Sequence, residues 1–211
     1  MDSPCFIESE IPECKYPTIT YKFYNNLIDK YMNIQNFEDS FKSDNQIFYY
    51  PKKILENHGS KIEFTKILTF QWRRVWPRGR TQRILGNGPE LAENLASRLP
   101  KNIILRLIDT ASLPISQQIA ILRKTDYYVG IHGTGLCLSI FAPNHCIFHE
   151  VLPRSNMNGL LLMAFLSGHK TYSDIIDANI EYEHNNEMVF FNEDEFADSV
   201  IEHLKENKLI D

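Results

Sequence analysis

Apolar residues along this chain change their spacing near residue 61. From there to the C-terminus, short apolar runs of strand length alternate with segments whose apolar residues recur at helical spacing. This alternation predicts βαβ units and a parallel sheet. Residues 1–60 lack this order, because prolines interrupt them and only one amphipathic helix is predicted, at 21–31. We therefore expect a Rossmann-like α/β domain with flanking helices at residues 61–211, and an N-terminal extension or the remnant of a first domain at residues 1–60.

The lengths of the apolar runs, together with capping and helix-breaking residues, predict where the individual helices and strands lie. Asn87 is a good N-cap residue, and Pro89 lies just inside a helix that we expect to run to Arg98. Gly168 suits the C-terminal end of a strongly apolar helix at 157–166. The remaining pattern predicts strands at 67–70, 102–108, 127–131 and 147–152, and helices at 113–122, 136–141 and 193–206.

Composition and charge narrow the class of protein. The chain has 211 residues, 43% of them hydrophobic and 23% charged, which excludes collagen-like, mucin-like and disordered proteins. Its net charge of −5 argues against a general nucleic-acid binder, because nonspecific affinity is built from Lys and Arg contacts. The apolar stretches are much shorter than the roughly 20 residues that span a bilayer, and the acidic N-terminus does not resemble a signal peptide. The sequence therefore predicts no membrane-spanning segment, and it does not indicate a cellular compartment.

The turn after the predicted strand 127–131 is the most informative motif. It reads Gly130-Ile-His-Gly-Thr-Gly-Leu136 and lies where a strand ends and a helix is expected to begin. Open α/β sheets bind ligands at this edge. Gly133 and Gly135 would let backbone amides approach a phosphate at the helix N-terminus, and His132 could add a hydrogen bond or a proton. A tight turn without a ligand is the alternative.

Two further features could complete such a site. Glu150, near the end of the predicted strand 147–152, could reach the same edge and hold sugar hydroxyls, although by itself a surface glutamate is the simpler interpretation. Residues 71–83 hold five arginines and both tryptophans but no acidic residue. Guanidinium groups bind phosphate oxygens bidentately, so a pyrophosphate site is one interpretation of this segment. Single-stranded nucleic acid and a solvated basic loop are the others, and the shortness of the patch on an acidic chain favours a small anion.

No metal site is expected. The sequence contains no C-x-x-C pair and no Asp-x-Asp, the carboxylate pair by which many sugar-nucleotide enzymes hold a divalent ion. The candidate zinc ligands do not have the spacing of a zinc site, and we interpret them as core or edge residues: His145, His149, Cys137 and Cys146.

Several blocks of the chain occur in an order and spacing that resemble one enzyme family. They are Arg83-Ile-Leu-Gly-Asn-Gly-Pro-Glu-Leu91, then Gln118 followed by Asp126-Tyr-Tyr-Val-Gly-Ile-His-Gly-Thr-Gly-Leu136, then Phe141-Ala-Pro143, Glu150 and Pro153, and Gly168-His-Lys-Thr-Tyr172. Together they resemble glycosyltransferase family 61, which includes EGF-domain-specific and protein O-mannose N-acetylglucosaminyltransferases and plant xylosyl- and arabinosyltransferases. The resemblance covers residues 66–204.

The resemblance implies a GT-B arrangement of two Rossmann-like domains, in which the C-terminal domain, residues 61–211 of this chain, holds the nucleotide sugar. It implies an inverting, metal-independent transfer of a sugar such as GlcNAc or a pentose, without a cofactor, from a UDP-sugar to a hydroxyl of a protein or glycan in the secretory pathway. Carried over by motif, the catalytic candidate is His132, which could act as the base or contact the donor phosphate. The nucleotide-sugar-binding candidates are Arg73, Arg74, Arg83, Gly133, Thr134, Gly135 and Glu150.

Length leaves other functions open. Residues 1–60 are too few to build a second Rossmann-like domain, and the implied transfer needs a cleft between two. A non-catalytic nucleotide-sugar-binding or interaction domain is therefore the alternative to an enzyme. An RNA-binding module that uses residues 71–83, which we call the Arg/Trp segment, is a less favoured third hypothesis.

Overall fold

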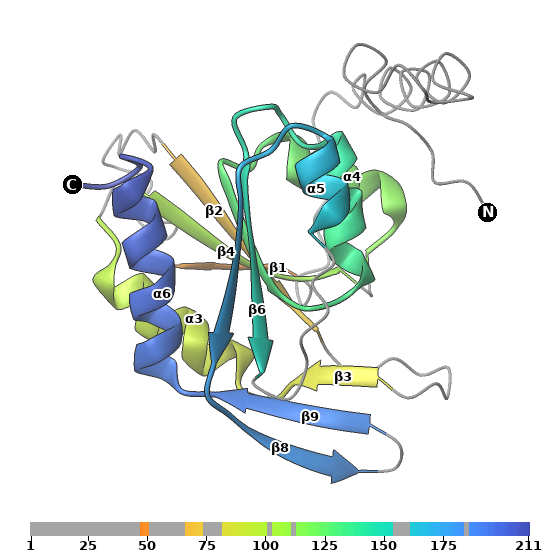
Figure 1. Cartoon of the computed structure of the whole chain (residues 1–211), viewed down its shortest axis with the longest axis vertical. Coiled ribbons are helices and arrows are strands. Elements are labelled where there is room, and N and C mark those ends of the chain that lie inside the picture. Colours follow the sequence, from red (N-terminus) through yellow and green to blue (C-terminus); the bar gives the residue numbers. More distant parts are fainter. Residues whose placement is uncertain are drawn as a thin grey trace.

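Five parallel strands form the centre of the structure, a computed structural model that describes residues 47–50, 66–73, 82–100, 103–110, 113–153, 161–183 and 186–211. A sixth strand pairs antiparallel at one edge, and the order is β1-β4-β2-β5-β6-β7 (Figure 1). The predicted Rossmann-like α/β sheet is thus confirmed over this part of the chain. The strands are β1 (Ile47–Tyr50), β2 (Lys66–Trp72), β4 (Ile103–Asp109), β5 (Tyr127–Ile131), β6 (Ile147–Pro153) and β7 (Thr171–Ile176).

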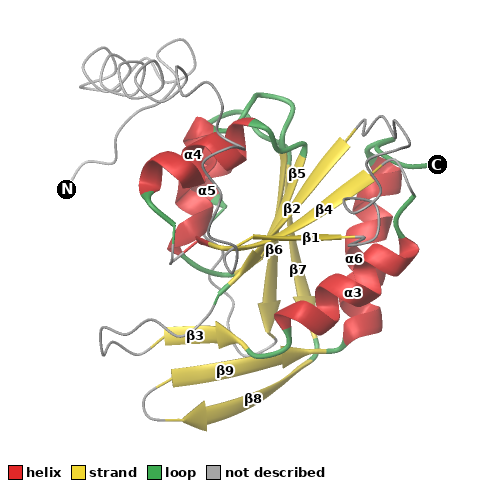
Figure 2. Ribbon diagram, turned by 180° about the vertical axis from the view of Figure 1, so that it is seen from behind, coloured by secondary structure: helices red, strands yellow, loops and turns green. Residues whose placement is uncertain are grey.

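Helices cover both faces of this sheet (Figures 1 and 2). One face carries α3 (Gly88–Arg98) and α6 (Glu193–Glu206), and the other carries α4 (Ile115–Arg123), α5 (Leu162–Leu166) and the 3-10 helix η3 (Thr134–Phe141). The chain runs from β2 outward to β4, then returns past β2 to β5. Because crossovers are almost always right-handed, these two opposite connections place their helices on opposite faces. The carboxyl ends of β2 and β5, which we call the switch point, are where doubly wound sheets bind ligands.

Alternate residues of each strand pack against the two helical layers. In β5, Tyr127 and Val129 belong to the buried cluster that includes residues of α3 and α6. Tyr128, between them, belongs to the cluster that includes residues of η3, α4 and α5. Successive side chains of a strand point to opposite faces, and full burial of one large apolar side chain contributes about 1.5–3 kcal/mol. Burial of apolar side chains therefore holds both helical layers against the sheet. The parity of a residue, its odd or even position along the strand, determines which layer its side chain faces.

A second, smaller sheet of three strands was not predicted from the sequence. It has the order β3-β9-β8, with β3 (Gln82–Leu85) parallel to β9 (Asn186–Phe191), and β8 (Ala178–Glu183) antiparallel to β9. β8 and β9 are partly exposed and carry polar residues among the apolar ones, so they lack the continuous apolar runs that predicted β5 and β6. The strands β1 and β7 were missed as well.

The ends of α3 and α6 can be compared with the helix limits and the cap predicted from the sequence. The limits predicted for α6 are confirmed: Asn192 Oδ1 accepts hydrogen bonds from the amides of Asp194 and Glu195 at 3.0 and 3.1 Å. Helix α3 also has its predicted limits, but Asn87 does not cap it through its side chain. Instead Asn87 Nδ2 donates to the carbonyl of Phe191 at 2.8 Å, which ties the start of α3 to the end of β9.

Two predicted helices differ from the structure, and a third cannot be compared. The segment predicted as a helix at 136–141 is the 3-10 helix η3, which begins two residues earlier. Of the helix predicted at 157–166, the structure describes α5, and Gly168 follows it with φ +80°, the left-handed conformation that suits a glycine C-cap. The helix predicted at 21–31 lies outside the described residues. Among those that are described, no helix is both long and apolar enough to cross a membrane.

Asp126 joins the start of β2 to the start of β5. Its Oδ2 accepts a hydrogen bond from the Ile67 amide at 2.7 Å, and its Oδ1 lies 3.4 Å from Lys66 Nζ. The Asp126 amide in turn donates to the Ile67 carbonyl at 2.9 Å. The aspartate of the family-like block 126–136 therefore aligns the two strands that form the switch point.

We expect Asp126→Ala to lower the free energy of unfolding by about 1.5–3 kcal/mol, because it removes a charged acceptor from a backbone amide. Urea denaturation would measure this. Asp198→Ala is the matched control, since that carboxylate is 74% exposed and pairs with Arg98 on the surface. The control should change stability by less than about 0.5 kcal/mol, and equal losses in the two variants would contradict the role of Asp126.

Candidate functional site

Arg73 and His132 meet at the switch point. Arg73 directly follows β2 and His132 directly follows β5, and Arg73 Nη1 donates to the His132 carbonyl at 3.1 Å. A Cβ built on Gly133 would overlap this guanidinium. The backbone of Gly133 is extended, so its conformation does not require glycine. Glycine at 133 therefore lets the Arg73 guanidinium approach the backbone, and a side chain there would displace it, a reason that the sequence did not reveal.

Glu150 is the acidic partner of His132. Its carboxylate is fully buried, and Oε1 lies 2.7 Å from His132 Nδ1. The interpretation of Glu150 as a surface residue is therefore wrong. Glu150 pairs with Gly130 in the β5–β6 register and has the same parity as Phe148, so it faces the layer of η3. Because a carboxylate accepts hydrogen bonds, His132 donates from Nδ1, which leaves Nε2 as the basic atom of the ring.

Arg83 lies on the small sheet and is held by a carboxylate. Arg83 and Glu187 are direct partners in the β3–β9 register, and the guanidinium contacts both carboxylate oxygens at 3.1 and 3.2 Å. The Leu85 amide donates to the Arg73 carbonyl at 2.8 Å, which fixes the end of β3 beside the end of β2. Glu187 lies 104 positions from Arg83. No local sequence signal connects the two, so sequence reasoning missed Glu187.

The charges of Arg73 and Arg83 act on each other. Burial lowers the pKa of Arg73, the nearby Arg83 lowers it further, and Glu187 opposes both effects. Arginine remains a cation at neutral pH despite such a shift, because its ordinary pKa is far above 7. The site thus holds two guanidinium groups, of which Arg83 is neutralised by Glu187, while Arg73 has no carboxylate partner among the described residues.

The remaining predicted site residues are only partly placed. The backbone of Thr134 and Gly135 begins η3, and the first hydrogen bond of this helix runs from the Leu136 amide to the Gly133 carbonyl at 3.1 Å. The amides of Thr134 and Gly135 therefore have no partner within the helix. Arg74 lies outside the described residues.

Other residues of the family-like blocks and of the Arg/Trp segment have structural roles. Gln118 Nε2 donates to the carbonyls of Thr110 and Leu113, both at 2.8 Å, which closes the turn between β4 and α4. Trp72 Nε1 donates to the Leu85 carbonyl at 3.0 Å, and a Cβ on Gly88 would overlap its indole ring. Trp72 is thus an anchor of β3 and α3 rather than a platform for stacking bases. Cys137 and Cys146 are free thiols, as expected, and Cys146 is buried.

Comparison with known families adds to this geometry. The family model described as Glycosyltransferase 61 matches residues 1–148. The chain belongs to this family. The match includes the turn that carries His132 and Gly133, and it also covers residues 1–60, which the sequence alone separates from the rest. A search of curated proteins found no match. This family 61 member is a glycosyltransferase with a Rossmann-like α/β sheet.

We expect Gly133→Ala to lower the free energy of unfolding by about 1–2 kcal/mol, because the added methyl group displaces Arg73 from the His132 carbonyl. In an Arg73→Ala background the same substitution should cost less than about 0.5 kcal/mol, since its clash partner is gone. Chemical denaturation of the four proteins in this cycle gives the coupling. An equal cost in both backgrounds would show that the close approach of Arg73 is not the reason for the glycine.

Proposed function

We propose that this glycosyltransferase binds a nucleoside diphosphate sugar at the switch point and transfers the sugar, with inversion, to a hydroxyl group. The observation that carries the proposal is that Arg73 and His132 meet at the carboxyl ends of β2 and β5, where Glu150 from the middle of β6 holds His132. In this proposal, residues 61–211 are the donor-binding half of a GT-B arrangement.

The diphosphate needs positive charge as it leaves. Within the described part of the chain, Arg73 pairs with no carboxylate and its hydrogen bond goes to a neutral carbonyl, whereas Arg83 is held by Glu187. Arg73 can therefore reorient to form a charge-assisted hydrogen bond with the diphosphate at a smaller energetic cost than Arg83, which would have to leave Glu187. Arg83 adds positive potential, and the first amides of η3 add donors. These groups supply the charge stabilisation that other enzymes obtain from a divalent ion, so we propose that transfer needs no metal.

His132 acts as the general base in this proposal. The acceptor oxygen attacks the anomeric carbon and its proton passes to His132 Nε2, while the bond from that carbon to the diphosphate oxygen breaks on the opposite side. The electron pair of the broken bond leaves with the diphosphate, so the configuration of the carbon inverts. Glu150 holds the Nδ1–H tautomer and stabilises the imidazolium that forms, as a carboxylate does for a catalytic histidine elsewhere.

The finer assignment follows from the family. We propose a UDP-sugar as donor, with GlcNAc or a pentose as the sugar, and a protein or glycan hydroxyl as acceptor. The compartment that goes with this chemistry is the lumen of the secretory pathway. The alternative is a domain that keeps the nucleotide-sugar pocket without catalysis, and the two predictions below separate binding from turnover.

We expect UDP or a UDP-sugar to raise the unfolding temperature of the chain, because a ligand that binds only the folded state adds RT ln(1 + [L]/Kd), about 2.7 kcal/mol at 100 times Kd. A thermal-shift screen with UDP, UDP-GlcNAc, UDP-xylose and GDP-sugars would measure this. Arg73→Gln should weaken binding about 10–100-fold, the value of one charge-assisted hydrogen bond. Arg98→Gln is the control, because Arg98, at the end of α3, pairs with two surface aspartates of α6. No shift with any nucleotide would defeat the proposal.

We expect His132→Ala to lower kcat by about 10²–10⁴-fold while UDP affinity stays near that of the wild type, because only proton transfer is lost. Single-turnover transfer and UDP titration would be measured on the same preparations. His145→Ala is the control, since that side chain is 65% exposed and lies near Asp126. If UDP affinity falls together with kcat, His132 contacts the phosphate instead. Full turnover in His132→Ala would remove it from the site.

A further inference from the structure

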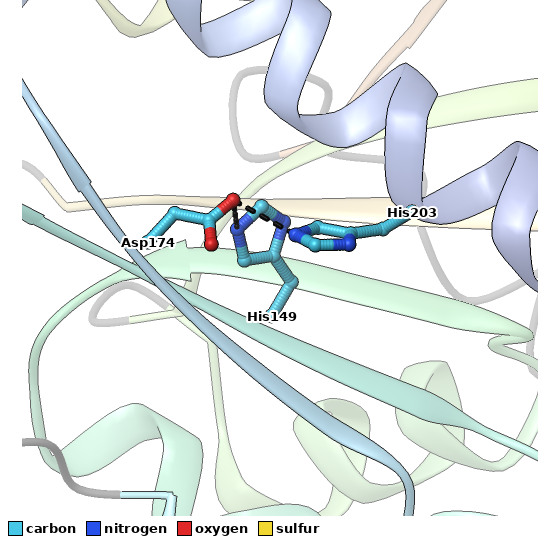
Figure 3. A group of neighbouring side chains, drawn as sticks. All are labelled: His149, Asp174 and His203. Carbon is cyan, nitrogen blue, oxygen red and sulfur yellow. Dashed lines mark hydrogen bonds and ion pairs between the residues drawn. The ribbon is translucent and has the colours of Figure 1, made fainter.

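Three side chains from three elements converge on the α3 and α6 side of the sheet (Figure 3). They are His149 of β6, Asp174 of β7 and His203 of α6. Asp174 Oδ2 lies 3.3 Å from His149 Nε2 and 2.8 Å from His203 Nε2. One ligand atom from each residue lies within 4.8 Å of the other two. His149 follows Phe148 and precedes Glu150 in β6, so alternation sends it to the face opposite Glu150.

We propose that His149, Asp174 and His203 form a structural zinc site that fastens α6 to β6 and to the edge strand β7. Two imidazoles and a carboxylate are a donor set that suits Zn²⁺, whereas Ca²⁺ and Mg²⁺ prefer oxygen alone. At zinc–ligand distances of about 2.0–2.2 Å, the ligand atoms of a tetrahedral site are about 3.3 Å apart. The distance from Asp174 to His149 has this value, and the distance to His203 is shorter, so His203 would move outward by a few tenths of an ångström on binding the ion. Its side chain is 30% exposed, which leaves room for a water molecule as fourth ligand.

The partners of the other ring nitrogens are those that a metal-bound histidine requires. A metal-bound histidine generally donates its second N–H to an acceptor. His149 Nδ1 lies 2.9 Å from Tyr127 Oη, which can accept this bond. His203 Nδ1 is buried, has no hydrogen-bond partner in the described part of the chain, and lies 3.6 Å from Glu206 Oε2. A metal at Nε2 of the neutral ring places the proton on Nδ1, toward Glu206, whereas without a metal an imidazolium would direct one N–H to Asp174 and the other toward Glu206.

Neighbouring groups prepare the ligands for the ion. Ser199 Oγ donates to Asp174 Oδ2 at 2.5 Å, and the Tyr172 ring stacks on the His203 ring with centroids 3.8 Å apart. These contacts hold the Asp174 carboxylate and the His203 ring in the orientation that the proposed site requires.

Direct metal binding tests the site independently of transfer. The full chain, stripped with a chelator, would be titrated with Zn²⁺ by calorimetry, and its metal content measured after dialysis. We expect one high-affinity zinc per chain. Asp174→Asn, which keeps the size of the side chain, should weaken binding by more than about 100-fold, and Tyr127→Phe should weaken it by about 10–100-fold. His145→Ala is the matched control and should bind like the wild type.

A second measurement protects the test from misfolding. Each variant would be checked by circular dichroism and by thermal unfolding without metal, so that only folded variants are compared. Co²⁺ in place of Zn²⁺ should give the intense visible absorption of tetrahedral cobalt in the wild type and in His145→Ala, and lose it in Asp174→Asn. If the wild type retains no zinc, or if folded Asp174→Asn and His203→Ala bind it as the wild type does, the cluster is a hydrogen-bonded or ionic network and the zinc site is ruled out.

Discussion

The reversal of strand order at β2 is the constraint on which the rest of this structure depends. β2 is hydrogen-bonded to β4 on one side and to β5 on the other, so the chain must leave it in one direction and return past it in the other. One crossover helix therefore cannot cover the carboxyl ends of both β2 and β5. Arg73 and His132 follow these two ends, which is why a positive and a basic group meet at a place where a ligand can approach.

Burial explains why the charged groups of the candidate site have defined partners. A charged group inside the protein is costly unless it is paired, and the charged groups described at the site have partners. Arg73 donates to a carbonyl, Arg83 is clamped by Glu187, and Glu150 holds His132. The same rule governs the core, where Arg106 is buried and lies within hydrogen-bond distance of the hydroxyls of Thr69 and Thr125. The candidate site is therefore oriented before any ligand arrives, which is the condition that the proposed stabilisation of a leaving diphosphate requires.

Neighbouring residues of β6 serve the two sides of the sheet. Glu150 reaches His132 in the layer of η3, and His149 reaches Asp174 and His203 in the layer of α6. The pleat of a strand separates these side chains although their backbones are adjacent. A zinc ion on the α6 side would fasten β6 without entering the donor site. The proposed metal site and the proposed metal-independent transfer are therefore compatible.

The sequence alone determined the features that depend on near neighbours. Apolar periodicity predicted β5 and α6 with their observed limits, and the turn at His132 and Gly133 directly follows β5 as predicted. These signals are local, because strand alternation, helix spacing and capping involve residues a few positions apart. The small sheet, the clamp of Arg83 by Glu187 and the group of His149, Asp174 and His203 had no such signal. Strand register and the packing of α6 bring together residues far apart in the chain, and only the tertiary structure could decide those contacts.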